Sequence, residues 1–194
     1  MTGVVLCGGQ SSRMGTDKGL LKLEARTWAQ TALDKLAEMQ LPVVLSVNAL
    51  QYPGYADVFR AEQLVKDNET LDIHGPLSGV LSVHLLFPQE DLFILACDMP
   101  LMETTVMAQL ITTYNDHPSF EAYVFSNNHE PEPLCGIYTA RGLAATIDRY
   151  QSKQLLKHSM KFALQNLLVH AIPIEIGQEK YFRNFNAHAE LNGL

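Results

Sequence analysis

The chain has 194 residues, of which 47% are hydrophobic and 18% charged, as in an ordinary globular protein. Its formal net charge of −7 argues against a protein that binds nucleic acid by neutralising backbone phosphates. No apolar run approaches the ~20 residues of a membrane span, and no signal peptide precedes the first predicted strand. We therefore expect one domain, residues 1–194, in the cytoplasm, with neither nucleic acid nor membrane as a partner.

Strands and helices alternate along the first half of the chain. The most apolar stretch, 92–97, is typical of a central strand that is covered on both faces. In chain order, we predict a strand at 3–6, a helix at 27–39, a strand at 43–47, a loop with a short helix at 51–61, a strand at 64–66, a helix at 75–86 and a strand at 92–97.

The second half continues the alternation. Pro173 places the last strand at a sheet edge. The predicted elements are a helix at 103–114, a strand at 122–125, a polar loop at 127–133, a strand at 134–139, helices at 141–150 and 153–167, a strand at 168–176 and a short helix from His188. This order predicts an α/β fold with a central, mostly parallel β-sheet flanked by helices. Ligands of such sheets bind beyond the carboxyl ends of the strands.

The stretch from Val4 to Leu21 is the most informative part of the sequence. A short apolar run ends at Gly8 and Gly9, and a polar loop with Arg13 and Lys18 follows. Glycines let backbone N–H groups approach an anion closely, and the two cations add positive charge beside them. The loop therefore predicts a phosphate site. It is neither a Walker A loop, because Gly19 follows Lys18, nor a Gly-x-Gly-x-x-Gly dinucleotide loop.

Single polar residues follow the other predicted strands of the first half. Asn48 follows the second strand, Asp67 the third and Asp98 the central one. In a parallel sheet these side chains meet the glycine-rich loop in one cleft. Asp98 suits Mg²⁺ as a hard oxygen ligand, and Asn48 and Asp67 suit a base or a ribose. Taken singly, Asp98 also fits a helix cap, and the other two fit turns.

These blocks together resemble the molybdenum cofactor guanylyltransferases, the MobA family of Rossmann-like nucleotidyltransferases. The stretch from Leu6 to Lys18 is similar to the signature loop of that family, although Cys7 stands where the family usually has Ala. Three further blocks follow in the order of the family: Asp67 with Gly75-Pro76-Leu77-Ser78-Gly79, then Cys97-Asp98-Met99-Pro100, then Asn184-Phe185-Asn186. The Gly-Lys-Pro and Thr-Pro sequences that often follow the first and last blocks are absent.

The resemblance implies a three-layer Rossmann-like fold and transfer of GMP from Mg-GTP to the terminal phosphate of molybdopterin, with release of pyrophosphate. It implies three catalytic residues, Arg13, Lys18 and Asp98, of which Asp98 holds Mg²⁺. The acceptor would be bound by Asn184 and Asn186. The nucleotide would be bound by Leu6, Cys7, Gly8, Gly9, Gly15, Lys18, Asn48, Asp67 and Asp98.

Several alternatives stay open at this point. The nucleotide could be CTP, as in molybdopterin cytidylyltransferases, or the acceptor could be a sugar phosphate. A non-catalytic nucleotide-binding module is a further alternative, and transient contact with molybdoenzymes or other cofactor-synthesis proteins is possible. Lys153, Lys157 and Lys161 have the spacing of one helix face, which is either solvated or binds the acceptor phosphate.

Overall fold

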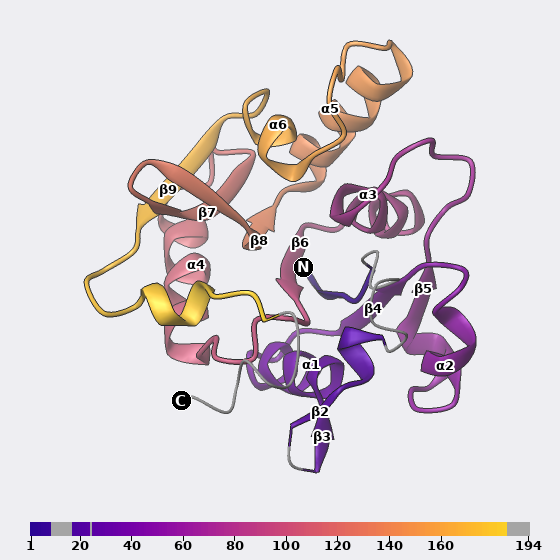
Figure 1. Cartoon of the computed structure of the whole chain (residues 1–194). Helices are drawn as coiled ribbons and strands as arrows, with labels where there is room; N and C mark the ends of the chain where they lie inside the picture. The colour runs from indigo at the N-terminus through magenta and orange to yellow at the C-terminus, as the bar shows by residue number, and fades with distance from the viewer. Residues whose placement is uncertain (9–16, 24, 186–194) are drawn as a thin grey trace.

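The computed structural model describes residues 1–8, 17–23 and 25–185 (Figure 1). Its main strands are β1 (Thr2–Leu6), β4 (Val43–Val47), β5 (Leu64–Lys66), β6 (Leu92–Ala96), β7 (Ala122–Asn127), β8 (Glu130–Tyr138) and β9 (Val169–Pro173). Over the described residues they form one seven-stranded sheet in the order β5-β4-β1-β6-β8-β7-β9.

Most neighbouring strands of this sheet are parallel. β1 pairs in parallel with β4 and β6, β4 with β5, and β7 with β9. Only β8 runs against both of its neighbours, β6 and β7. The predicted, mostly parallel α/β sheet is confirmed, and the predicted edge position of β9 is confirmed with it.

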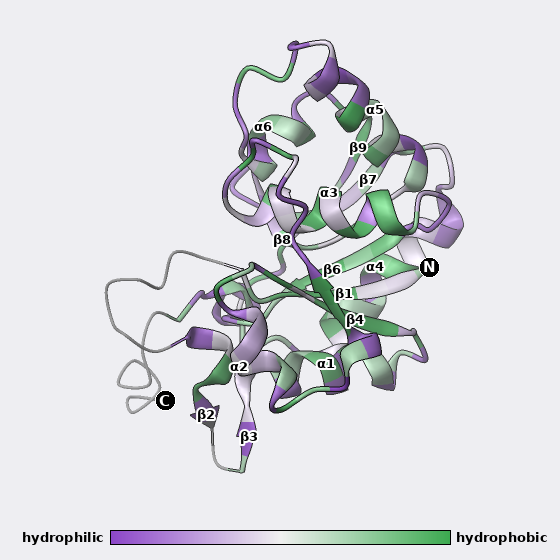
Figure 2. Cartoon of the chain, turned by 90° about the vertical axis from the view of Figure 1, so that its right-hand side faces the viewer, coloured by the Kyte–Doolittle hydropathy of each residue, from purple (hydrophilic) through white to green (hydrophobic). Residues whose placement is uncertain are grey.

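Helices cover both faces of the sheet, which gives three layers (Figure 1). One core lies between the sheet and α1 (Trp28–Glu38), α2 (Tyr52–Ala56) and α4 (Thr104–Asp116). The other lies between the sheet and α3 (Pro76–Leu86), α5 (Ala140–Gln151) and α6 (Met160–Leu164). In Figure 2, the hydrophobic colour is concentrated on the central strands β1 and β4 between these layers. No helix of the described residues is long and apolar enough to cross a membrane.

Local sequence explains where the flanking helices begin. The Thr27 side chain accepts a hydrogen bond from the Gln30 amide at 3.1 Å and caps α1. Helix α3 begins with Pro76, after Gly75 with a φ of 79°. Residues 77–84 of α3 are all buried, because the helix lies between the sheet and α5. The apolar content of residues 77–84 thus reflects burial on all sides, whereas Leu85 and Leu86 at the end of α3 are exposed.

The predicted helix over 153–167 is wrong. Helix α5 ends at Gln151, and Lys153 has a φ of 59°, a left-handed conformation that ends a helix. The amides of Gln154 and Leu155 both donate to the Arg149 carbonyl, at 2.8 and 3.1 Å. Only Met160–Leu164 is helical, as α6. The three lysines of this stretch therefore do not share one helix face.

The predicted loop over 127–133 is also wrong, because β7 and β8 form a tight hairpin there. Asn128 and His129 turn the chain, both with positive φ, at 48° and 69°. Pro131 pairs with Ser126 of β7 and has no partner in β6, and Pro133 lies in the register shift that follows, so a missing N–H is tolerated at both positions. A small hairpin, β2 (Lys22–Leu23) and β3 (Arg26–Thr27), was not predicted. The helix predicted from His188 lies outside the described residues.

Candidate functional site

A cavity of about 610 Å³ lies at the carboxyl ends of β1, β4, β5 and β6. It brings together seven of the predicted site residues, namely Leu6, Cys7, Gly8, Lys18, Asn48, Asp67 and Asp98. It also contains residues that were not predicted as ligand contacts, among them Ile73, His74, Pro76 and Leu134. The parallel sheet thus gathers residues from positions 6 to 98 in one place, as the strand-end argument predicts.

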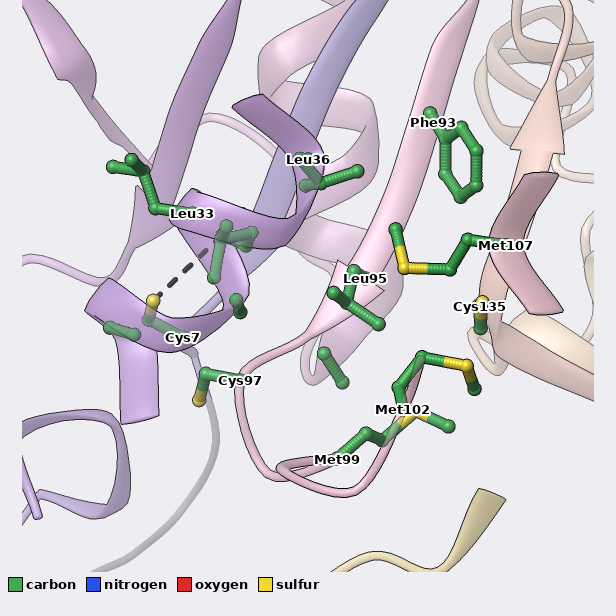
Figure 3. Close-up of a cluster of buried hydrophobic side chains, with 14 of the residues drawn as sticks. Cys7, Leu33, Leu36, Phe93, Leu95, Cys97, Met99, Met102, Met107 and Cys135 are labelled. Carbon is green, nitrogen blue, oxygen red and sulfur yellow. Dashed lines mark hydrogen bonds between the residues drawn. The ribbon is translucent and has the colours of Figure 1, made fainter. Parts of the chain in front are cut away.

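The end of β1 explains how Cys7 fits. Val5 and Cys7 pack in the core beside α1, whereas Leu6 packs in the opposite core, as alternation along a strand requires. Figure 3 shows the Cys7 and Cys97 side chains at the end of the first core. The thiol of Cys7 is buried, and its backbone carbonyl is what faces its polar neighbours. A thiol in place of a methyl group therefore fills core space.

Lys18 and Asp98 face each other in the cavity. Lys18 Nζ lies 3.7 Å from Asp98 Oδ2, and both side chains are about three-quarters buried, with exposed fractions of 27% and 22%. Burial raises the pKa of Asp98, and the charge of Lys18 opposes that rise. A carboxylate has about four lone-pair sites on its two oxygens, so Asp98 can pair with Lys18 and still bind a cation that arrives with a ligand.

The turn that carries Asp98 is held from several directions. The Phe185 amide donates to the Asp98 carbonyl at 2.9 Å, and the Cys97 amide donates to the Leu6 carbonyl at 3.1 Å. Lys35 Nζ donates to the Pro100 carbonyl at 2.6 Å. Burial lowers the pKa of Lys35 to about 8, against the opposing charges of nearby carboxylates. The position of Asp98 is thus fixed by backbone contacts on both sides of it.

Asp67 and Asn48 lie at the other end of the cavity. Asp67 Oδ1 accepts from Ser46 Oγ at 3.0 Å, and a Cβ built on Gly8 would lie 3.8 Å from Asp67 Oδ2. Burial raises the pKa of Asp67, and the Ser46 hydrogen bond opposes it. Asn48 Oδ1 accepts from the amides of Leu50 and Gln51, at 3.0 and 2.9 Å. The Asn48 amide group is thus oriented by its own turn.

Two residues of the α2 segment that the sequence did not suggest contact the site. The Asp17 carboxylate accepts from Tyr55 Oη at 2.8 Å, from the Gly19 amide at 2.9 Å and from Gln51 Nε2. Gln51 Nε2 also donates to the Cys7 carbonyl at 3.0 Å. The Asp17-Lys18 sequence at the end of the loop indicates that Asp17 has a partner. Nothing in the sequence indicates that the partners are Gln51 and Tyr55.

The remaining predicted site residues are placed less directly. Asn184 does not line the cavity, but its neighbour Phe185 is fully buried and bonded to the backbone of Asp98. The C-terminal segment therefore passes beside the metal-binding candidate. Four further candidates lie outside the described residues: Gly9, Arg13, Gly15 and Asn186.

The donor set fits Mg²⁺ bound jointly with a ligand better than a metal held by protein alone. Among the described residues, no three His, Cys, Asp or Glu side chains are grouped as a metal site. Mg²⁺ usually takes one or two carboxylates together with phosphate oxygens and waters. The buried carboxylate of Asp98, in a cavity that also holds Lys18, matches that pattern.

Comparisons with known proteins agree with this geometry. A probable molybdenum cofactor guanylyltransferase of Geobacillus sp. strain WCH70 is 30% identical over 199 residues, covering 100% of this chain and 97% of the relative. The molybdenum cofactor guanylyltransferase of Campylobacter jejuni strain RM1221 is 26% identical, covering 96% of this chain and 91% of the relative.

Solved structures show the same fold. The crystal structure of molybdopterin-guanine dinucleotide biosynthesis protein A from Archaeoglobus fulgidus matches with a TM-score of 0.75 at 20% identity. The match covers 100% of this chain and 96% of that one. The two chains thus share a Rossmann-like fold over nearly their whole length.

The family model described as the MobA-like NTP transferase domain matches residues 3–168. The chain belongs to this family, and it is a nucleotidyltransferase.

Proposed function

We propose that this protein transfers GMP from GTP to the terminal phosphate of molybdopterin, forming the guanine dinucleotide cofactor and releasing pyrophosphate. The observation that carries the proposal is the cavity that joins Gly8, Lys18, Asp67 and Asp98 at one sheet edge. The names of the two relatives above support the choice of GTP and of molybdopterin. We further propose that residues 1–194 form one domain and act in the cytoplasm.

The polar residues of the cavity divide the work of binding the nucleotide. Lys18, with Arg13 and the amides of the glycine-rich loop, would bind the phosphates that leave as pyrophosphate. Asp67 would accept hydrogen bonds from the base or the ribose, and Asn48 would contact the same end of the nucleotide. This division rests on the positions in the cavity, where Lys18 lies beside Asp98 and Asp67 lies beside Gly8.

The reaction needs positioning more than proton transfer. The acceptor is a phosphate monoester, which is already an anion near neutral pH, so no general base is required. Asp98 would hold Mg²⁺, and this ion when bound neutralises phosphate charge. Lys18 would stabilise the negative charge that develops on the departing pyrophosphate. Asn184 and Asn186 would hold the acceptor on the Asp98 side, where the Phe185 amide joins that turn. The product is expected to pass to molybdoenzymes through transient contact.

The direct test is incubation with Mg²⁺, an acceptor and each nucleoside triphosphate in turn, with pyrophosphate release as the readout. The acceptor is molybdopterin in one series and a sugar phosphate in a second. We expect release with GTP that depends on molybdopterin. Turnover with CTP instead would indicate a cytidylyltransferase, and turnover only with a sugar phosphate would identify a different acceptor. Tight nucleotide binding without turnover would favour a binding module.

A charge-removal pair links the test to the cavity. Lys18→Ala should weaken GTP binding and turnover, because the variant loses the cation that pairs with Asp98 in the cavity. Lys157→Ala is the matched control, since Lys157 is exposed and does not line the cavity. Wild-type kinetics in Lys18→Ala would contradict the assigned role.

A further inference from the structure

We propose that Gln51 and Tyr55 are positioning residues that set the place of Lys18 in the nucleotide site. They form, with Asp17, a hydrogen-bonded group that we name the α2 clasp. The inference rests on the proposed nucleotide-binding role of the cavity and extends it to residues that do not line it. The two residues lie 34 and 38 positions from Asp17 in the sequence.

The Gln51 side chain connects three separate segments of the site. Its Nε2 donates to the Cys7 carbonyl at the end of β1, at 3.0 Å, and to the Asp17 carboxylate. Its Oε1 accepts from the Asn48 amide at 3.2 Å. Cys7 and Asp17 lie on the two described segments that flank residues 9–16. One amide group thus fixes the distance between β1, the β4 end and the segment that carries Lys18.

Tyr55 contacts the same segment, the one that carries Asp17 and Lys18, through its hydroxyl group. The Tyr55 side chain is fully buried and stacks on Phe59 with ring centroids 5.7 Å apart, so its hydroxyl has a fixed position. That hydroxyl donates to Asp17 Oδ1 at 2.8 Å. Burial, together with the nearby Cys7, Cys97 and Asp17, raises the pKa of Tyr55 far above its ordinary value. The hydroxyl therefore remains a hydrogen-bond donor at any physiological pH.

Close packing at Gly19 shows how little freedom the clasp leaves. A Cβ built on Gly19 would lie 2.0 Å from Tyr55 Oη and 3.3 Å from Cys97 Sγ. The Gly19 backbone thus packs directly against the Tyr55 hydroxyl and the Cys97 side chain that follows β6. The next side chain back along the chain, Lys18, is directed toward Asp98, 3.7 Å away. Fixing Asp17 and Gly19 on either side fixes Lys18 between them.

The clasp predicts a functional cost for removing a single oxygen atom. Tyr55→Phe keeps the buried ring and removes only the donor to a carboxylate, and a hydrogen bond to a charged group corresponds to at least about tenfold in an equilibrium constant. We expect the Kd for GTP with Mg²⁺, measured by calorimetry without acceptor, to rise about tenfold. Tyr52→Phe is the matched control, on the same helix and outside the clasp, and should bind like the wild type.

A double-mutant cycle separates positioning from general weakening. If Tyr55 acts through Lys18, the loss caused by Tyr55→Phe should largely disappear in a Lys18→Ala background. Equal losses in both backgrounds, or no loss in the first, would overturn the proposal. Gln51→Met provides an independent arm should Tyr55→Phe not fold, because Gln51 is only half-buried and Met keeps its length. Gln51→Met should show the same coupling to Lys18.

The wild-type titration distinguishes failure of the clasp from failure of the proposed function. GTP, CTP, ATP and UTP are each titrated with Mg²⁺. If the wild type prefers CTP, guanylyl transfer is wrong, and the same cycle with CTP still decides the role of the clasp. If the wild type binds GTP and the variants bind it equally well, only the clasp is wrong. If the wild type binds none of the four, both inferences are wrong.

Discussion

The two halves of the sheet are built differently, and only one of them carries the polar chemistry of the cavity. In the first half, β5, β4, β1 and β6 are all parallel, so four carboxyl ends meet at one edge. In the second half, β8 runs the opposite way between β6 and β7. Among the described residues that line the cavity, only Leu134 comes from beyond Asp98.

The difference shows what strand direction does for function. A parallel strand delivers the loop after it to the cavity edge, and such loops bring Gly8, Asp67 and Asp98. β8 instead brings a residue from its middle, Leu134, which adds an apolar side chain to the cavity wall. The second half therefore bounds the site and supports it, and its exposed charges, such as the Lys161–Glu130 pair, lie outside the cavity.

The sharpest test of this contrast compares one aspartate from each half. Asp98→Ala should lower kcat/KM for guanylyl transfer by about 10²–10³-fold or more, because a buried charged group at the reacting phosphates is lost. Asp148→Ala, on the exposed side of α5, should leave kcat/KM unchanged. Thermal unfolding of both variants should stay close to wild type. Full activity in Asp98→Ala would contradict the assignment of the polar chemistry to the first half of the sheet.

Two glycines test the contrast through packing. Gly19→Ala places a Cβ 2.0 Å from Tyr55 Oη, and Gly142→Ala, in α5, places one 2.6 Å from the Glu121 carbonyl oxygen. Each should lower the free energy of unfolding by about 1–3 kcal/mol, as overpacking does. Denaturant titration measures that loss, and nucleotide titration measures function. Only Gly19→Ala should also weaken GTP binding, and equal effects of both variants on binding would contradict the division.

A buried histidine makes the first half sensitive to acid. Burial lowers the pKa of His84 in α3, so the folded protein holds it neutral while the unfolded chain binds a proton below about pH 6.5. Protonation of His84 thus favours unfolding, and this one group should lower the free energy of unfolding as the pH drops below that value. His84→Leu should reduce the loss between about pH 7 and about pH 5, measured by urea unfolding. The control His158→Leu, at an exposed histidine, should leave the loss of stability over this pH range unchanged.

The smallest effect is expected at the exposed ion pair of the second half. Lys161 Nζ lies 2.9 Å from Glu130 Oε2, with exposed side-chain fractions of 51% and 72%. Lys161→Ala should change the free energy of unfolding by at most about 1 kcal/mol, and Glu130→Gln should have a similar effect. Guanylyl transfer should continue at the wild-type rate in both. A large activity loss would place functional chemistry in the second half after all.

The sequence predicted the first half of the fold better than the second, for physical reasons. In the first half, apolar stretches end at single polar residues, which mark the end of a strand clearly. The strands at 43–47 and 64–66 therefore have the predicted bounds. The wrong helix prediction over 153–159 came from apolar residues such as Leu155. Leu155 is buried, but the backbone that carries it is not helical. The prolines predicted a loop where β8 begins. That prediction was wrong because the sequence does not reveal that the first residues of β8 pair with β7 alone, which tolerates proline.

The candidate site was predictable to the extent that its residues follow strands. Lys18, Asp67 and Asp98 share one cavity, as the strand-end argument required, and their chemical roles remain predictions. The contacts of Gln51 and Tyr55 could not be predicted, since they depend on how α2 packs against the segment at Asp17, more than 30 residues away in sequence. The sequence signals which residues end strands, but not which distant side chains hold them there.

The hydrogen bond from the Phe185 amide to the Asp98 carbonyl gives the protein a built-in spectroscopic probe. Phe185 is fully buried, so its N–H should exchange with deuterium only when this contact opens. The exchange rate of that one amide therefore reports the local stability of the Asp98 turn in the absence of any turnover. Slower exchange on adding GTP and Mg²⁺ would show the turn tightening around its ligand, and unchanged exchange would show a turn already rigid beforehand.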